Sequence, residues 1–287
     1  MSAMPPDATI TGLRTLCEHL ASSTAELVRA QTPTTVEVAA TKSNDLDVVT
    51  RADRAAEDYL RSEIARWRPQ DAILGEEGGA SDGLSGLTWV VDPIDGTVNY
   101  LYGLGSCSVS VAVVLGEADP ARWQLLAAAV CEIPTGTTWS AARGRGATRD
   151  ATPVRVREAT DLRHALVATG FHYDDALRAG QGRSVGELLA HVRDVRRFGS
   201  AALDLCRVAD GRVDAYYEEG LSPWDHAAGT LVVEEAGGVV HGVAGGAPGR
   251  GLVVAGPAGT LDVLEPLLAR LGAGRRPGIT PGFPPAV

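Results

Sequence analysis

TWVVDPIDGTVNY, residues 88–100, is a strand-like run that ends in two acids three positions apart, Asp92 and Asp95. Residues 88–91 have the composition of a buried β-strand. Like charges held this close destabilise a fold unless a cation lies between them. The stretch therefore predicts a strand of the core that ends at a cation-binding site.

The residues between and after these acids indicate which cation. Pro93 disfavours a helix at Asp92, so we expect a sharp turn that directs both carboxylates and the Ile94 carbonyl to one point. Oxygen ligands of this kind suit Mg²⁺ or Mn²⁺ rather than zinc. Gly96 lets a ligand approach the backbone, and Thr97 can open a short helix whose N–H groups bind phosphate. An acidic surface turn explains either acid alone but not the whole hexapeptide DPIDGT.

Two further acids stand in similar settings. Glu76 follows the apolar run AIL in a glycine-flanked turn, and Asp225 follows Trp224 at the start of an apolar helix. Each acid taken alone is more often a helix cap or a solvated residue. Together with Asp92 and Asp95 they are candidate metal ligands.

Composition limits the class of protein and its partners. The chain has 287 residues, 45% of them hydrophobic and 22% charged, which describes a folded globular protein. Its net charge of −10 argues against a nucleic-acid partner, which demands a basic face. An acidic protein can still bind an anionic substrate if bound metal ions reverse the local charge.

No signal peptide or membrane span is predicted, and the cytoplasm is the expected location. The longest uncharged stretch, residues 96–116, contains the alternating run SCSVSVAV and is predicted to form a strand. The four cysteines have no paired spacing suited to zinc or redox chemistry, and we expect buried thiols in a reducing compartment. They are Cys17, Cys107, Cys131 and Cys206.

The order of patterns predicts an α+β or layered α/β fold. Apolar residues at helical spacing predict helices over 13–28 and from Thr50 onward. Residues 1–150 are rich in antiparallel strand signals, with a further strand expected at 154–156. Residues 151–287 alternate strands with helices. We expect one compact catalytic unit built from these two halves, with a frayed tail over 273–287.

Three motifs in order resemble the inositol monophosphatase family: GEE (75–77), WVVDPIDGTVNY (89–100) and PWDHAAGTLVVEEAGG (223–238). The likeness extends from KSNDLDVVTRAD (42–53) to the last motif, nearly the whole chain. It implies a five-layered αβαβα sandwich, usually assembled as a homodimer. It also implies an Mg²⁺-dependent, lithium-sensitive phosphatase.

The resemblance assigns the metal ligands. Glu76, Asp92 and the Ile94 carbonyl would hold a first Mg²⁺. Asp92 would bridge to a second ion held by Asp95 and Asp225, with Mn²⁺ able to replace Mg²⁺. A third ion is also known at such sites. Two cations of this kind clamp the attacking and leaving oxygens of an in-line displacement.

The resemblance also assigns the chemistry around the phosphate. The nucleophile would be a metal-bound water oriented by Glu76 and Thr97. The phosphate would rest on the backbone N–H groups of Gly96 and Thr97, and the leaving alkoxide would be stabilised by the second metal.

Three residues nearer the N-terminus match family positions around the metal waters or on the active-site loop. Asp53 and Asp47 match acids near those waters, and Asp53 is either a partner of the waters or a weak third-metal ligand. Asp53 also has capping-box spacing to Thr50, and the two roles are compatible. Lys42 matches a lysine of the flexible loop, although a solvated lysine explains it nearly as well.

Substrate choice depends on two further matches. Glu218 matches the position that accepts a hydrogen bond from an inositol hydroxyl, and Ala201 matches one whose backbone N–H faces the ring. Asp95 is also expected to contact the substrate. A carboxylate there suits a polyol and would repel a second phosphate. We expect hydrolysis of myo-inositol 1-phosphate. Histidinol phosphate is the alternative substrate, and a non-catalytic interaction module is the non-enzyme alternative.

Overall fold

The computed structural model describes residues 7–31, 38–41 and 48–274. Lys42 and Asp47 lie outside the described residues, and so does most of the predicted tail. The helices are α1 Asp7–Gln31, α2 Arg51–Trp67, α3 Thr97–Leu101, α4 Asp175–Leu188, α5 Ala201–Ala209, α6 Pro223–Glu235 and α7 Ala258–Arg270, with 3₁₀ turns at Leu162–His164 and Val243–Gly245.

The strands described in the structure form three sheets. A two-stranded ribbon contains β1 Val38–Thr41 and β2 Val48–Thr50. An eight-stranded sheet contains β3 Ala72–Gly75, β4 Gly79–Ser81, β5 Leu87–Asp95, β6 Ser108–Leu115, β7 Gln124–Glu132, β8 Thr138–Ala142, β9 Ala147–Arg149 and β10 Thr152–Pro153. A five-stranded sheet contains β11 Leu166–Thr169, β12 Asp194–Arg196, β13 Ala215–Glu218, β14 Val239–His241 and β15 Val253–Gly256.

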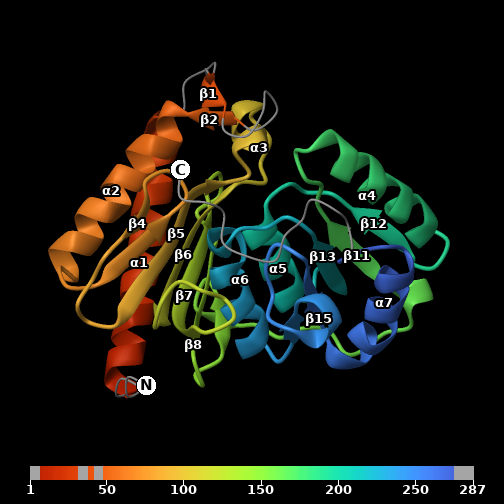
Figure 1. Cartoon of the computed structure of the whole chain (residues 1–287). Coiled ribbons are helices and arrows are strands. Elements are labelled where there is room, and N and C mark those ends of the chain that lie inside the picture. The colour runs from red at the N-terminus through yellow and green to blue at the C-terminus, as the bar shows by residue number, and fades with distance from the viewer. Residues whose placement is uncertain (1–6, 32–37, 42–47, 275–287) are drawn as a thin grey trace.

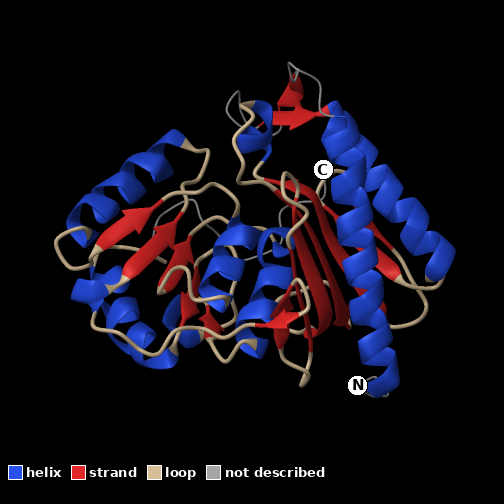
Figure 2. Cartoon of the chain, turned by 180° about the vertical axis from the view of Figure 1, so that it is seen from behind, coloured by secondary structure: helices blue, strands red, loops and turns tan. Residues whose placement is uncertain are grey.

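Five layers follow one another across the molecule, as Figures 1 and 2 show. Helices α1 and α2 cover the outer face of the eight-stranded sheet, and α5 and α6 lie between the two large sheets. Helices α4 and α7 cover the outer face of the five-stranded sheet. The predicted αβαβα sandwich is confirmed.

Both faces of each large sheet are buried, which explains the nearly continuous apolar strands of this sequence. On β5, Trp89 and Val91 belong to the hydrophobic cluster under α1 and α2, whereas Val90 belongs to the cluster around α5 and α6. On β13, Tyr216 faces the central helices and Tyr217 packs with the cluster of α7. Alternation with period two therefore separates the layers.

The two large sheets differ in strand direction. The eight-stranded sheet has the order β10-β9-β8-β7-β6-β5-β3-β4, and its pairs are antiparallel except for β3 with β5. The five-stranded sheet has the order β12-β11-β13-β15-β14 and is mixed. Antiparallel strand signals in the first half and α/β alternation in the second are confirmed. The boundary between two halves near residue 150 stays a prediction.

One local prediction was wrong. Residues 154–156 lie outside any strand, because the chain has already paired as β9 and β10 around Asp150 and Ala151, both at positive φ (48° and 62°). The short strand β4, which follows the turn at Glu76, was not predicted.

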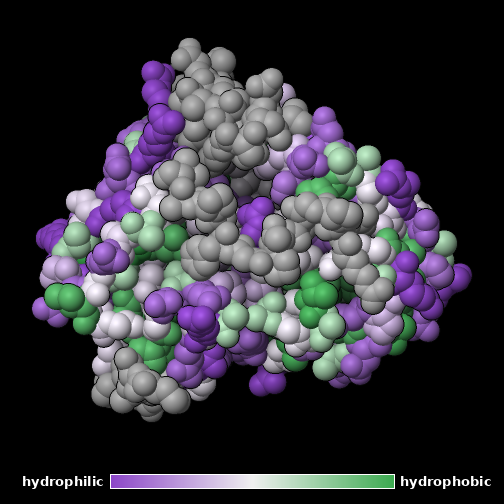
Figure 3. All heavy atoms as spheres, viewed as in Figure 1, coloured by the Kyte–Doolittle hydropathy of each residue, from purple (hydrophilic) through white to green (hydrophobic). Residues whose placement is uncertain are grey.

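The surface in Figure 3 mixes hydrophilic and hydrophobic residues, with hydrophobic groups scattered in small areas of the described part. All four cysteines are free and buried, as expected. No helix in the described ranges combines the length and hydrophobicity needed to span a bilayer.

Candidate active site

A β-bulge separates the two central acids. In the pairing of β5 with β6, Asp92 lies opposite Ser110 and Asp95 opposite Ser108, so three steps along β5 match two along β6. The strand therefore continues through Pro93 instead of ending before it, as the sequence had suggested. Bulges of this kind re-aim side chains at the edge of a site. Asp92 and Asp95 are both buried, as is Ile94 between them.

Asp95 is held by residues more than a hundred positions further along the chain. Its Oδ2 accepts hydrogen bonds from the Ser200 hydroxyl at 2.6 Å and the Ala202 N–H at 2.7 Å. The Ala201 N–H lies 3.3 Å from Oδ1. The first turn of α5 therefore fixes the carboxylate, an interaction that sequence spacing gave no means to find.

Glu76 lies in a turn that Glu57 of α2 supports from below. The Glu57 carboxylate accepts the N–H groups of Glu77 at 2.7 Å and Gly78 at 2.8 Å, and it is paired with Arg61 at 2.7 Å. A Cβ at Gly75 would overlap the Glu57 carboxyl group. The glycines of this turn thus make room for a buried acid that positions Glu76. The sequence analysis missed Glu57.

Thr97 and Asp53 meet on the other side of the site. The Thr97 hydroxyl lies 3.1 Å from Asp53 Oδ1 and 3.1 Å from the Ile94 carbonyl oxygen. Asp53 is buried in the first turn of α2. The structure therefore brings Asp53 together with the threonine and the Ile94 carbonyl of DPIDGT. Nothing is described of the Thr50 side chain, the expected capping partner of Asp53.

Gly96 stands at the start of α3 in a left-handed conformation, with φ 91°. A Cβ there would lie 2.8 Å from the Ser106 carbonyl oxygen and 2.9 Å from the Gly199 carbonyl oxygen. Both the positive φ and the crowding require glycine at this position. Gly96 therefore has the conformation and the packing that the DPIDGT motif requires of a glycine.

Asp225 enters the site from α6. It is the third residue of that helix, and its carboxylate accepts the Ser222 N–H at 2.6 Å, closing a capping box. The helix begins at Pro223, two residues before the acid. The cap and the predicted ligand role are compatible, because a carboxylate has several acceptor positions.

The acids of the site influence one another electrostatically. Burial, then the negative charges of Glu76, Asp95 and Asp225, raise the pKa of Asp92 well above its usual range. Asp92 and Glu76 also share a hydrogen bond. Burial and the charges of Glu76 and Asp95 likewise raise the pKa of Asp225. Burial raises the pKa of Asp95 to about 6, against the lowering effect of its hydrogen bonds.

The acids affect one another's pKa values over distances longer than those of metal coordination. Within the described ranges, no three His, Cys, Asp or Glu side chains converge closely enough to hold a metal ion as they stand. The same acids are close enough to raise one another's pKa, and every candidate donor is an oxygen. Buried, mutually repelling oxygen donors are a donor set that fits a hard divalent cation.

Glu218 lies at the end of β13, on the five-stranded sheet. Its Oε2 accepts the Tyr216 hydroxyl at 2.8 Å, and a Cβ at Gly170 would overlap the carboxyl group. Burial raises the pKa of Glu218 to about 7, while the Tyr216 bond and the nearby Arg197 charge lower it. The residue as a whole is half-buried.

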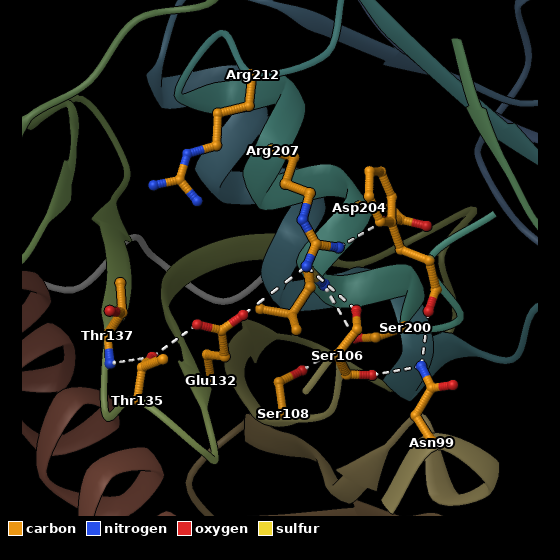
Figure 4. Close-up of polar contacts among 12 residues, drawn as sticks. Asn99, Ser106, Ser108, Glu132, Thr135, Thr137, Ser200, Asp204, Arg207 and Arg212 are labelled. Carbon is orange, nitrogen blue, oxygen red and sulfur yellow. Dashed lines mark hydrogen bonds and ion pairs between the residues drawn. The ribbon is translucent and has the colours of Figure 1, made fainter. Parts of the chain in front are cut away.

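A polar junction behind Asp95 connects three segments (Figure 4). The Asn99 amide donates to the carbonyl oxygens of Ser106 at 2.7 Å and Phe198 at 2.6 Å. The hydroxyls of Ser108 and Ser200 lie 3.2 Å apart. This junction ties the segment after DPIDGT to the start of α5.

Arg207, in the last turn of α5, belongs to the same junction. Its guanidinium donates to Asp204 at 2.8 Å and to the Ser106 hydroxyl at 3.1 Å, and it lies 3.8 Å from Glu132. It also stacks over the Phe198 ring at 4.3 Å. The sequence showed Asp204 and Arg207 at helical spacing, but not their distant partners.

The fold and the site together define a layered α/β protein in which acids from β5, the turn after β3 and the start of α6 influence one another's pKa values. The inositol monophosphatase family model matches residues 12–271, and the chain belongs to that family.

Three relatives give this likeness a scale. The inositol-1-monophosphatase of Mycobacterium leprae is 42% identical, over 92% of this chain and 96% of its own length. The Nus factor SuhB of Escherichia coli is 40% identical, over 75% of this chain and 79% of its own. SaIMPase-II, solved with inositol monophosphate bound, is 25% identical with a TM-score of 0.71, covering 91% of this chain and 96% of its own.

Proposed function

We propose that this protein is an Mg²⁺-dependent phosphomonoesterase that hydrolyses myo-inositol 1-phosphate. The observation that carries the proposal is the gathering of Glu76, Asp92 and Asp225 from three separate elements, close enough to raise the pKa values of Asp92 and Asp225. Such a concentration of buried negative charge is costly unless it serves to bind cations. Family membership as a phosphatase supports the same conclusion.

Glu76, Asp92, the Ile94 carbonyl, Asp95 and Asp225 are the residues that would hold Mg²⁺. The bound ions would polarise the phosphoryl group and lower the pKa of water.

The chain's own groups would set the geometry for that chemistry. Ser200 and Ala202 hold Asp95 in one orientation. The Thr97 hydroxyl, next to Asp53, is placed to orient a water molecule, and Glu76 is the candidate proton acceptor. The backbone N–H groups of Gly96 and Thr97, at the start of α3, are the candidate phosphate contacts.

Two findings support a polyol as the leaving group. The Glu218 carboxylate accepts a hydrogen bond from the Tyr216 hydroxyl and has further acceptor positions for a substrate hydroxyl, and SaIMPase-II was solved with inositol monophosphate bound. Histidinol phosphate stays the alternative substrate. A non-catalytic module would be expected to have lost a ligand, and all the expected acids are present. We also propose a homodimer, which light scattering of the purified protein tests.

Phosphate release from myo-inositol 1-phosphate tests the proposal. We expect turnover with Mg²⁺, loss of turnover in metal-free buffer, and inhibition by Li⁺ and by excess Mg²⁺. A parallel assay with histidinol phosphate, fructose 1,6-bisphosphate and 3′-phosphoadenosine 5′-phosphate ranks the substrates. Full activity after exhaustive treatment with EDTA would exclude the proposed metal chemistry.

A further inference from the structure

One cation on the five-stranded-sheet side of the site has not been given a role. Arg197 follows β12 and precedes Gly199 and the first turn of α5. The residue is exposed. Its guanidinium lies against the Gly199 backbone, since a Cβ at Gly199 would overlap Nη1 and approach Asn99 Nδ2 to 2.7 Å.

Arg197 lies beside the two carboxylates expected to face the leaving group. Its positive charge lowers the pKa values of both Asp95 and Glu218, so it is within electrostatic reach of each. No side chain in the described part of the structure forms a hydrogen bond or ion pair with it. Its five N–H donors are therefore available to a ligand.

The neighbouring Arg196 makes a useful contrast. Its Nη1 donates to Asp194 at 2.5 Å and to the Val195 carbonyl oxygen at 2.9 Å. The two arginines are adjacent in sequence and equally charged, but Arg196 is engaged on its own strand. Arg197 instead lies against the Gly199 backbone.

The position of Gly199 places this cation close to the phosphate-binding backbone. The Gly199 carbonyl oxygen is in contact with Gly96, and Gly199 has a φ of 95°, which favours glycine. Arg197 thus lies against Gly199, whose carbonyl oxygen contacts Gly96, and its charge reaches the Glu218 carboxyl group.

We propose that Arg197 is a specificity residue that donates hydrogen bonds to a hydroxyl oxygen of the leaving group. Glu218 accepts from one hydroxyl and Arg197 donates to another, a donor and acceptor pair that suits the neighbouring hydroxyls of a polyol. The same cation disfavours a leaving group that carries positive charge. This inference rests on the proposed function, because it concerns the leaving-group side of that site.

The test compares Arg197→Gln with the matched control Arg196→Gln on three substrates. With myo-inositol 1-phosphate, we expect kcat/KM of Arg197→Gln to fall by about 10- to 100-fold, as loss of a charge-assisted hydrogen bond implies. With 4-nitrophenyl phosphate, which offers no hydroxyl, the rate should stay within about 3-fold of wild type. The rate with histidinol phosphate should rise or stay unchanged. Arg196→Gln should match wild type throughout.

Equal losses on all three substrates would overturn the inference, since Arg197 would then serve the phosphate or the fold. No loss on any of them would show a solvated cation and overturn it as well.

The wild-type rates test the proposed function independently of the role of Arg197. If the wild type hydrolyses a different polyol phosphate, a selective loss in Arg197→Gln on that substrate supports the inference although inositol was the wrong polyol. If the wild type hydrolyses nothing, calorimetry with a phosphonate analogue of inositol 1-phosphate and with inorganic phosphate replaces turnover. Weaker binding of the analogue alone supports a role for Arg197, and equal effects on both ligands contradict it.

Discussion

Two groups of buried acids lie close together in this protein, and they differ in how their charge is balanced. In the first group, the negative charges of Glu76, Asp95 and Asp225 each raise the pKa of Asp92. In the junction behind it, burial raises the pKa of Asp204, but Arg207 pairs with that carboxylate at 2.8 Å and lowers it. The Asp204–Arg207 pair is balanced and stabilises the fold, whereas the acids around Asp92 lack a compensating cation, as a cation-binding site would.

Replacing Asp95 or Asp225 should produce the largest effect on turnover and little effect on folding. Asp95→Asn and Asp225→Asn should each lower kcat by at least about 100-fold, because losing a ligand should exceed the loss of a ligand's hydrogen-bond partner. The free energy of unfolding without metal should stay equal or rise as repulsion is relieved. Steady-state kinetics with a Mg²⁺ titration, beside urea denaturation, measures both. Wild-type rates at saturating Mg²⁺ would contradict the second metal site.

Asp194→Asn is the control for these variants. Asp194 is a half-buried acid paired with Arg196 on β12, and its loss should leave turnover and Mg²⁺ dependence unchanged.

Removing the cation of the junction should have the opposite signature. Arg207→Leu leaves Asp204 buried without its partner, and we expect the free energy of unfolding to fall by about 3 kcal/mol. Chemical denaturation measures this loss. If the cost arises from the unpaired charge, the double variant Asp204→Leu, Arg207→Leu should recover part of it. A single variant as stable as wild type would show that Arg207 balances nothing.

Neutralising Glu218 should affect one substrate class and leave the metal chemistry intact. Glu218→Gln keeps the shape of the side chain, and kcat/KM for myo-inositol 1-phosphate should fall by about 10- to 100-fold. Hydrolysis of 4-nitrophenyl phosphate should be almost unchanged. Equal losses on both substrates would place Glu218 in support of the metal site or the fold. No change on either would make it a solvated acid.

The same variant predicts the smallest effect, a change in the pH dependence of stability. The folded-state pKa of Glu218 is raised from 4.5 to about 7, so its neutral form stabilises the fold fully below the unfolded value. That contribution is lost as pH rises through about 7. The melting temperature of Glu218→Gln relative to wild type should therefore increase between pH 5 and pH 8 in metal-free buffer. Glu158→Gln, an exposed acid, serves as the control, and a flat difference would contradict the raised pKa.

The resemblance to the family predicted the layers, and local patterns identified the candidate acids, but contacts that span the chain were not predicted. The hexapeptide DPIDGT, the turn at Glu76 and the start of α6 are local patterns, so their chemistry could be read directly. Pro93 suggested the end of a strand, because a proline lacks the N–H of a ladder, but the bulge lets β5 continue.

Contacts of long sequence separation could not be predicted from spacing. Glu57 supports the turn of Glu76 from twenty residues away, and Arg207 reaches Ser106 across 101 positions. Both are polar residues on helices, where a solvated surface position is the more common explanation. Only the packed layers show which of them face inward.

The hydrogen bonds from Ser200 and Ala202 to Asp95 have a consequence for how the protein is made. On a ribosome, the first half of the chain emerges with β5 already synthesised, 105 residues before Ser200 appears. Asp95 then lacks the groups that orient it, so a nascent or truncated chain has an incomplete site even if its sheet has formed. Metal affinity and turnover should consequently appear late in biosynthesis, when α5 docks. We therefore expect activity only in chains that have completed folding.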